Sequence, residues 1–150
     1  MAESDPSRIR SLAVSREDVI DAFAYNRENP ATAVLRVTPP FHGRMRARIH
    51  VSNELSAQTV WRDGATGSIH LEPESLLEQE VVDSYPVFEQ VYASMNESES
   101  VGESGTDVHE HYERRLKEWR QSARNRVLDE VELVGDGSDT LHRIDLKWLG

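Results

Sequence analysis

The sequence predicts an α+β protein with one antiparallel sheet. Three observations lead to this class: apolar residues recur with a helical period in two long segments, they alternate with polar residues in several short segments, and the connections are short. Short connections between strands favour antiparallel pairing. We therefore expect a meander of about four strands plus a C-terminal hairpin, packed against an N-terminal helix and a long helix near 107–125. The 150 residues are expected to form a single domain.

The N-terminal helix is expected within residues 14–30, VSREDVIDAFAYNRENP. Ser15 is the expected N-cap, and Asp18 completes a weak capping box. Pro30 ends the helix because the residue before a proline disfavours the helical conformation. Residues 1–12, which precede this helix, are mixed and polar and are expected to be a frayed tail.

The strands of the meander are expected to follow. TAVLRVT (32–38) alternates, and Pro39-Pro40 ends it because proline cannot donate to a ladder. RMRARIHV (44–51) is the second predicted strand. AQTVW (57–61) and SIHL (68–71) are the third and fourth, and the Asp-Gly pair between them is a hairpin signal.

The second half is predicted to be helical and then to end in a hairpin. Pro73 and Pro86 each open a short helix. Residues 94–107 are rich in Ser, Gly and acids and are expected to be a flexible acidic loop. Residues 127–134 and 140–149 read as two strands joined by GDGSD. The long helix before them carries one apolar stripe, made of Val108, Tyr112, Leu116, Trp119, Ala123 and Val127.

Composition excludes some classes of site and suggests a habitat. The absence of cysteine excludes disulfides and thiolate metal sites. No apolar run reaches the roughly 18 residues of a membrane span, and the first residues lack the apolar core of a signal peptide. We therefore expect a cytoplasmic protein with no membrane partner.

Arginine strongly outnumbers lysine among the 17 basic residues, against 27 acids and a net charge of −10. This composition resembles that of cytoplasmic proteins of salt-loving archaea, and the chain resembles a small uncharacterised haloarchaeal protein, a domain of unknown function. In molar salt, exposed ion pairs are screened within about 3 Å. An acidic protein from a GC-rich genome has the same composition. The resemblance carries no functional residue.

The negative excess lies in one block of the chain. Residues 72–113 hold twelve acids and no Lys or Arg, whereas 1–71 and 114–150 each carry a net charge of +1. Residues 29–53 hold four arginines and no acid. The acidic block could be a solvated surface, a docking segment for a basic partner, a mimic of nucleic-acid charge, or a cover for these arginines.

Arginines alternate along the second predicted strand. Arg44, Arg46 and Arg48, here called the Arg strip, would project with His50 from one face at a spacing of about 7 Å. Arg36 on the preceding strand could join them, and Phe41 could stack on a base. Guanidinium groups bind phosphate in a bidentate manner. The strip therefore indicates an anion or partner site, although a solvated face paired with acids would have the same pattern.

No motif specifies a reaction. His109 and Glu113 have the i,i+4 spacing of weak metal ligands, but spacing indicates no third ligand. His50, His70 and His142 lie on different predicted strands and could converge. The chain has no nucleophile elbow and no phosphate-binding loop fingerprint. We therefore predict no catalytic residue, no cofactor and no metal.

Three functions remain open. The first is a non-enzymatic interaction or regulatory module that binds another macromolecule, with a protein partner or a second copy of the chain as the expected partner. The second is a nucleic-acid-associated protein that uses the Arg strip. The third is a small enzyme with an anion-binding site.

Overall fold

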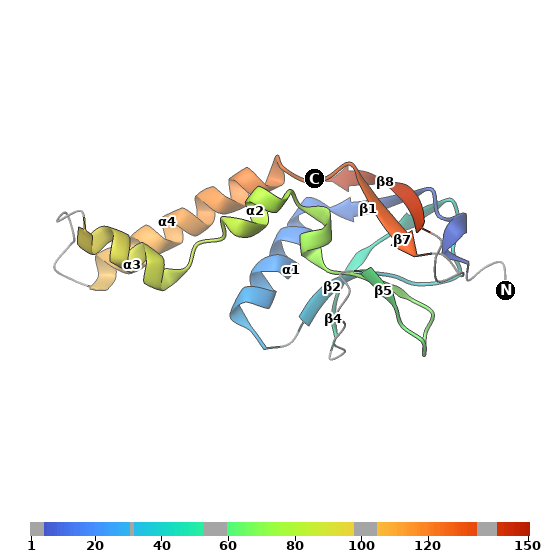
Figure 1. Ribbon diagram of the computed structural model, residues 1–150, viewed down its shortest axis with the longest axis horizontal. Coiled ribbons are helices and arrows are strands. Elements are labelled where there is room, and N and C mark those ends of the chain that lie inside the picture. Colours follow the sequence, from blue (N-terminus) through green and yellow to red (C-terminus); the bar gives the residue numbers. More distant parts are fainter. Residues whose placement is uncertain (1–4, 31, 53–59, 98–104, 135–140) are drawn as a thin grey trace. The chain divides into compact units, whose positions relative to one another are not determined.

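The computed structural model describes residues 5–30, 32–52, 60–97, 105–134 and 141–150. It confirms the α+β class (Figure 1). The chain forms two compact units, which we call the strand unit (residues 1–77 and 127–150) and the helical unit (residues 78–126). The expectation of a single domain stays a prediction.

The first sheet of the strand unit combines both ends of the chain. Its order is β3-β1-β8-β7, and its strands are β1 (Ser11–Ser15), β3 (Arg44–Arg46), β7 (Glu130–Val134) and β8 (Leu141–Leu149). β1 is parallel to both β3 and β8, whereas β7 and β8 form the predicted antiparallel hairpin. The loop between β7 and β8, with GDGSD, lies outside the described residues.

β1 differs from the frayed tail expected over residues 1–12. Ile9 and Leu12 are fully buried, and β1 lies between two strands of the sheet. A 3-10 turn, Pro6–Arg8, precedes it, and the Asp5 carboxylate accepts a hydrogen bond from the Ser7 N–H at 2.9 Å. The strand was missed because its two partners come from distant parts of the chain, so local pattern alone does not identify it.

The second sheet is antiparallel throughout. Its order is β4-β2-β6-β5, and its strands are β2 (Thr32–Val37), β4 (Arg48–Ser52), β5 (Val60–Arg62) and β6 (Ile69–Leu71). The predicted pairs β2–β4 and β5–β6 both occur. They are connected by the antiparallel pairing of β2 with β6. The sheet is therefore two hairpins side by side and not a simple meander.

The predicted strand over residues 44–51 is divided between the two sheets. Ala47 separates β3, which pairs with β1, from β4, which pairs with β2. Its side chain is fully buried, and its N–H donates to the Ala13 carbonyl at 3.0 Å. On the other side of the strand unit, β5 lies beside β7. The two sheets therefore enclose a common core, which includes Leu12, Val14, Leu35, Leu71, Leu133 and Ile144.

The N-terminal helix, α1 (Arg16–Glu28), is confirmed and is fastened to β2. The Ser15 hydroxyl accepts a hydrogen bond from the Asp18 N–H at 3.3 Å, as the capping pattern predicts. The Asn26 amide donates to the Ala33 carbonyl at 2.9 Å and accepts from the Ala33 N–H at 2.6 Å. A 3-10 turn, η3 (Pro73–Leu76), also lies beside α1.

The helical unit contains α2 (Gln79–Asp83), α3 (Phe88–Glu97) and α4 (Gly105–Arg124). α4 is the predicted long helix, but it ends at Arg124, so Val127, the last residue of the predicted apolar stripe, lies outside it and forms a bridge with Leu77. An acidic loop was expected over residues 94–107. Its two ends are helical and belong to α3 and α4, and residues 98–104 lie outside the described residues. Among the helices that the structure describes, none combines the length and the apolar character that a membrane span requires.

Candidate anion-binding face

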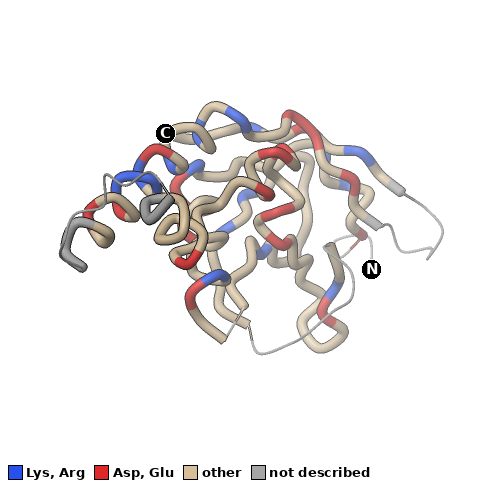
Figure 2. Tube along the Cα trace, turned by 60° about the vertical axis from the view of Figure 1, so that its left-hand side comes forward, with Lys and Arg blue, Asp and Glu red and all other residues tan. Residues whose placement is uncertain are grey.

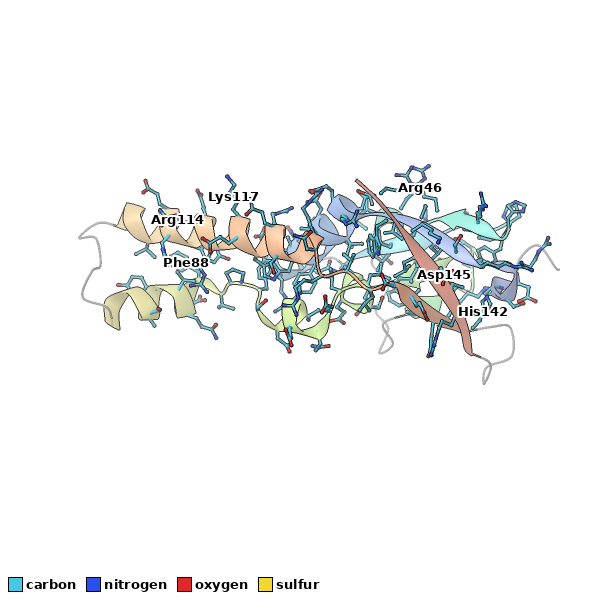
Figure 3. All side chains as sticks on the ribbon, turned by 90° about the horizontal axis from the view of Figure 1, so that it is seen from above. Arg46, Phe88, Arg114, Lys117, His142 and Asp145 are labelled. Carbon is cyan, nitrogen blue, oxygen red and sulfur yellow. The ribbon has the colours of Figure 1, made fainter. Side chains whose placement is uncertain are left out.

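The outer face of the first sheet has a low floor made by β1. The outward residues of β1 include Ser11 and Ala13, which are small and half-buried. Ser11 is in register with Arg44 on one side and Asp145 on the other, and Ala13 is in register with Arg46 and Lys147. Because neighbouring strands lie about 4.8 Å apart, the longer side chains of β3 and β8 stand on both sides of this floor. Figure 3 labels Arg46 of β3 and Asp145 of β8.

This arrangement forms a groove of about 660 Å³ with predominantly basic walls. Four of its lining residues are cationic and one is a carboxylate: Arg8, Arg10, Arg44, Lys147 and Asp145. The Gly43 carbonyl accepts hydrogen bonds from the backbone N–H groups of both Arg10 and Ser11, at 2.8 and 3.0 Å, which holds the N-terminal segment beside β3. Figure 2 shows acidic and basic residues at many places along the chain. The net charge of −10 for the whole protein therefore does not give the charge of this particular face.

The Arg strip is exposed along its whole length. Within the described part of the chain, none of its three guanidinium groups forms an ion pair or a hydrogen bond. On the first sheet, which holds Arg44 and Arg46, Arg143 pairs with Glu130 at 3.2 Å and with Glu132 at 3.3 Å. The acids of β7 therefore pair with Arg143, and the two strip arginines of this sheet stay open to solvent.

The second sheet carries a polar row across all four of its strands. The register places Trp61 opposite His70, His70 opposite Arg36, and Arg36 opposite Arg48. We call these four residues the cross-strand row. Residues that face each other on neighbouring antiparallel strands share one face of the sheet. His50, two residues after Arg48, lies on that face as well, because side chains alternate along a strand.

The aromatic rings of this face are in contact. The Trp61 ring lies 5.2 Å from the His70 ring in an edge-to-face arrangement, and the His50 ring lies 5.9 Å from the His70 ring. His70 is only 2% exposed, whereas Trp61 and His50 are half-buried. Burial lowers the pKa of His50, and the positive charge of Arg36 lowers it further. His50 is therefore neutral near pH 7.

Arg36 and Arg48 face each other directly across β2 and β4. Like charges in this position destabilise a sheet. Neither guanidinium forms an ion pair or hydrogen bond with the described residues. The nearby carboxylate of Asp63 accepts a hydrogen bond from the Ala65 N–H at 2.8 Å, which keeps the pKa of Asp63 low. An anion from outside would relieve the repulsion between the two arginines.

Phe41 does not have the position that the sequence suggested. It is 0% exposed, and the Arg62 guanidinium lies 5.9 Å from its ring centre. It therefore cannot stack on a base, because the chain after Pro39-Pro40 turns this ring into the core. The aromatic residue that shares a face with the arginines is Trp61. Sequence reasoning missed it because the pairing of β6 with β2, which brings β5 to this face, is not visible locally.

His142 and His109 do not join this face. His142 is on β8, and its Nε2 atom is hydrogen-bonded to the Ile9 carbonyl. His109 and Glu113, the weak metal candidates, are exposed on α4, and the His109 ring lies 5.2 Å from the Phe88 ring. Within the described ranges, no group of three or more His, Asp or Glu side chains is arranged to hold a metal ion.

A second cavity, of about 260 Å³, lies where α1 meets η3. Phe23, Asn26 and Arg27 line it from the helix, and Glu72 and Glu74 line it from the turn. Burial, together with a hydrogen bond to the neighbouring Glu74 and the charge of Glu74, raises the pKa of Glu72 from 4.5 to about 7. Glu72 is therefore partly protonated near neutral pH.

Replacing Glu72 by glutamine is expected to remove a pH dependence of stability. The native pKa lies above the unfolded one, so the native protein binds the proton more tightly, and stability falls as the pH rises from about 4.5 to about 7. In Glu72→Gln this fall is absent, so the free energy of unfolding of the variant rises relative to that of the wild type as the pH increases from about 4.5 to about 7. Denaturant midpoints measured at intervals from pH 4 to 8 test this. The exposed Glu89→Gln on α3 is the control, and parallel curves for Glu72→Gln and the wild type would contradict the expectation.

The fold and this face together define a small α+β protein with an exposed basic groove on its strand unit. The chain belongs to the family described as a domain of unknown function, DUF8009, whose model matches residues 1–150. Neither the curated proteins nor the solved structures contain a match to the chain.

Proposed function

We propose that this protein is a non-enzymatic binding module whose partner is a nucleic acid, held by its phosphates on the outer face of the strand unit. One observation carries the proposal: the three guanidinium groups of the Arg strip are exposed and make no ion pair within the described residues. The chain has 27 acids against 17 basic residues, so intramolecular partners for these cations would be abundant. Because these guanidinium groups stay exposed and without an acidic partner among the described residues, we infer that they bind an anion from outside the chain.

The geometry suits a phosphate backbone. Arg44 and Arg46 are successive outward residues of β3 and therefore lie about 7 Å apart, and arginine binds phosphate in a bidentate manner. The groove adds Arg8, Arg10 and Lys147 beside Arg44. A backbone that follows β3 toward β4 would meet Arg44, Arg46 and Arg48 in turn.

A protein partner or a second copy of the chain is the second candidate. It is supported by β4, an edge strand that leaves Ile49 42% and Val51 48% exposed. Unpaired edges with apolar side chains are templates for association.

We also propose that the protein works in the cytoplasm of a salt-loving archaeon. The support is compositional: a net charge of −10, arginine in place of lysine, and no cysteine. In molar salt the release of counterions contributes little to nucleic-acid binding, so phosphate contacts alone would be weak there.

The double variant Arg44→Ser with Arg46→Ser is expected to weaken binding of a labelled oligonucleotide at least tenfold at about 0.1 M salt. Two phosphate contacts are lost, and the slope of log K against log salt should fall by about 0.7 for each. Fluorescence anisotropy titrations at several salt concentrations measure both quantities.

The matched control is Arg114→Ser with Lys117→Ser on α4, where both side chains are exposed (Figure 3). It removes the same charge from the helical unit and should change the affinity less than twofold. Equal weakening by both double variants, or no binding by the wild type at low salt, would refute the proposal.

A further inference from the structure

We infer that the nucleic acid is single-stranded and that its bases lie on the face of the second sheet that carries Trp61 and His50. This inference rests on the proposed function, because it takes the phosphate contacts of the Arg strip as given. It adds the class of ligand and a second set of contacts, which are made to bases and not to phosphates.

The cross-strand row brings aromatic rings and guanidinium groups together on one face of the second sheet. Trp61, His70, Arg36 and Arg48 come from four neighbouring strands, so the row spans the whole sheet. The buried His70 ring contacts both Trp61 and His50, so each of the two half-buried rings packs against a buried neighbour. Rings held in this way can present a face or an edge to a ligand without losing further side-chain freedom on binding.

The charge of this face complements a phosphate chain. Arg36 and Arg48 stand opposite each other and form no ion pair within the described residues. His50 is neutral near pH 7, because burial and Arg36 lower its pKa. The face therefore offers two cations for phosphates and two rings for bases, and guanidinium planes also stack on bases.

The row and the Arg strip are continuous through the chain. Arg46 ends β3, Ala47 is buried, and Arg48 begins β4, so Arg48 belongs to both the strip and the row. A strand that follows the arginines would reach the row with its bases beside Trp61 and His50. In a duplex the base faces are occupied by their neighbours, so only an unstacked single strand can use such a surface.

Base stacking would also sustain binding at high salt. The phosphate contribution falls steeply with salt concentration, whereas burial of ring faces does not depend on counterion release. A protein with the composition of a halophile would therefore need the row in addition to the strip.

The test compares three probes of about 15 nucleotides with the wild-type protein: single-stranded oligothymidine, an abasic strand with the same number of phosphates, and a duplex. We expect oligothymidine to bind at least tenfold more tightly than the abasic strand and than the duplex. We also expect the variant Trp61→Leu to lose most of this preference while its affinity for the abasic strand is unchanged. Tyr92→Leu, which alters an exposed aromatic residue of α3, should behave like the wild type.

Each outcome has a separate meaning. Equal affinity for oligothymidine and the abasic strand, or tighter binding of the duplex, would overturn the inference and leave the proposed function standing. No binding of any probe would overturn the proposed function and the inference together. The comparison of probes needs only the wild type, so it decides the question even when Trp61→Leu does not fold.

Discussion

Leu12→Ala is expected to lower the free energy of unfolding by about 2–5 kcal/mol, the usual cost of truncating a fully buried leucine. Leu12 is 0% exposed on β1, in register with Met45 of β3 and Leu146 of β8. β1 lies between these two strands, so a cavity there weakens the packing of both. Chemical denaturation followed by circular dichroism measures the loss.

The control for this variant is Ser11→Ala, the neighbouring residue on the outer face of β1. Its effect should stay within about 0.5 kcal/mol, because the side chain lies outside the core. A loss below about 1 kcal/mol for Leu12→Ala would show that β1 is not an interior strand of the sheet.

Trp119→Ala is expected to cost about 3–5 kcal/mol. The indole is 5% exposed on α4, and its N–H donates to the Val81 carbonyl at 2.9 Å. Its ring also contacts Tyr85 edge-to-face at 4.9 Å. The truncation therefore leaves a cavity, removes an aromatic pair and removes one of the hydrogen bonds to the Val81 carbonyl, which still accepts from the N–H and hydroxyl of Ser84.

Tyr92→Ala, on the exposed side of α3, is the matched control for the loss of an aromatic ring, and its effect should be well below 1 kcal/mol. A loss of similar size for Trp119→Ala and Tyr92→Ala would contradict the role of Trp119 as the anchor of the helical unit.

The two core variants together test the expectation of a single domain. Leu12 lies in the strand unit and Trp119 in the helical unit. In one cooperative domain both variants shift the same unfolding transition. If the protein unfolds in two steps, and each variant moves only one of them, the units are separate domains.

Part of the candidate site could be read from the sequence. The alternation of arginines with Met45 and Ala47 predicted an exposed strip on one strand face; all three arginines are exposed, but only Arg44 and Arg46 share a strand, because Arg48 belongs to the second sheet. The groove was not predictable in this way, because Arg8 and Arg10 lie in the expected tail and Lys147 comes from the other end of the chain. These residues meet only because β1 pairs in parallel with both β3 and β8.

The aromatic part of the site illustrates the same limit. Phe41 was the ring nearest to the arginines along the chain, and it is fully buried. Trp61 was correctly assigned to a strand. Its position beside the arginines was not predicted, because it depends on His70, which lies opposite both Trp61 and Arg36. Which strands become neighbours depends on how the two hairpins join through β2 and β6, and the hydrophobic pattern of each strand does not contain that information.

The sequence by itself determined the local structure of this protein: the α+β class, α1 with its Ser15 cap, the apolar stripe of α4 and the two hairpins of the second sheet. These features depend on short-range periodicity, capping and turn residues, which act over a few positions. The tertiary structure alone decided that residues 44–51 divide at Ala47 between two sheets and that β1 is an interior strand. Such pairings join distant segments, and their free energy comes from burying a shared core and not from any local preference.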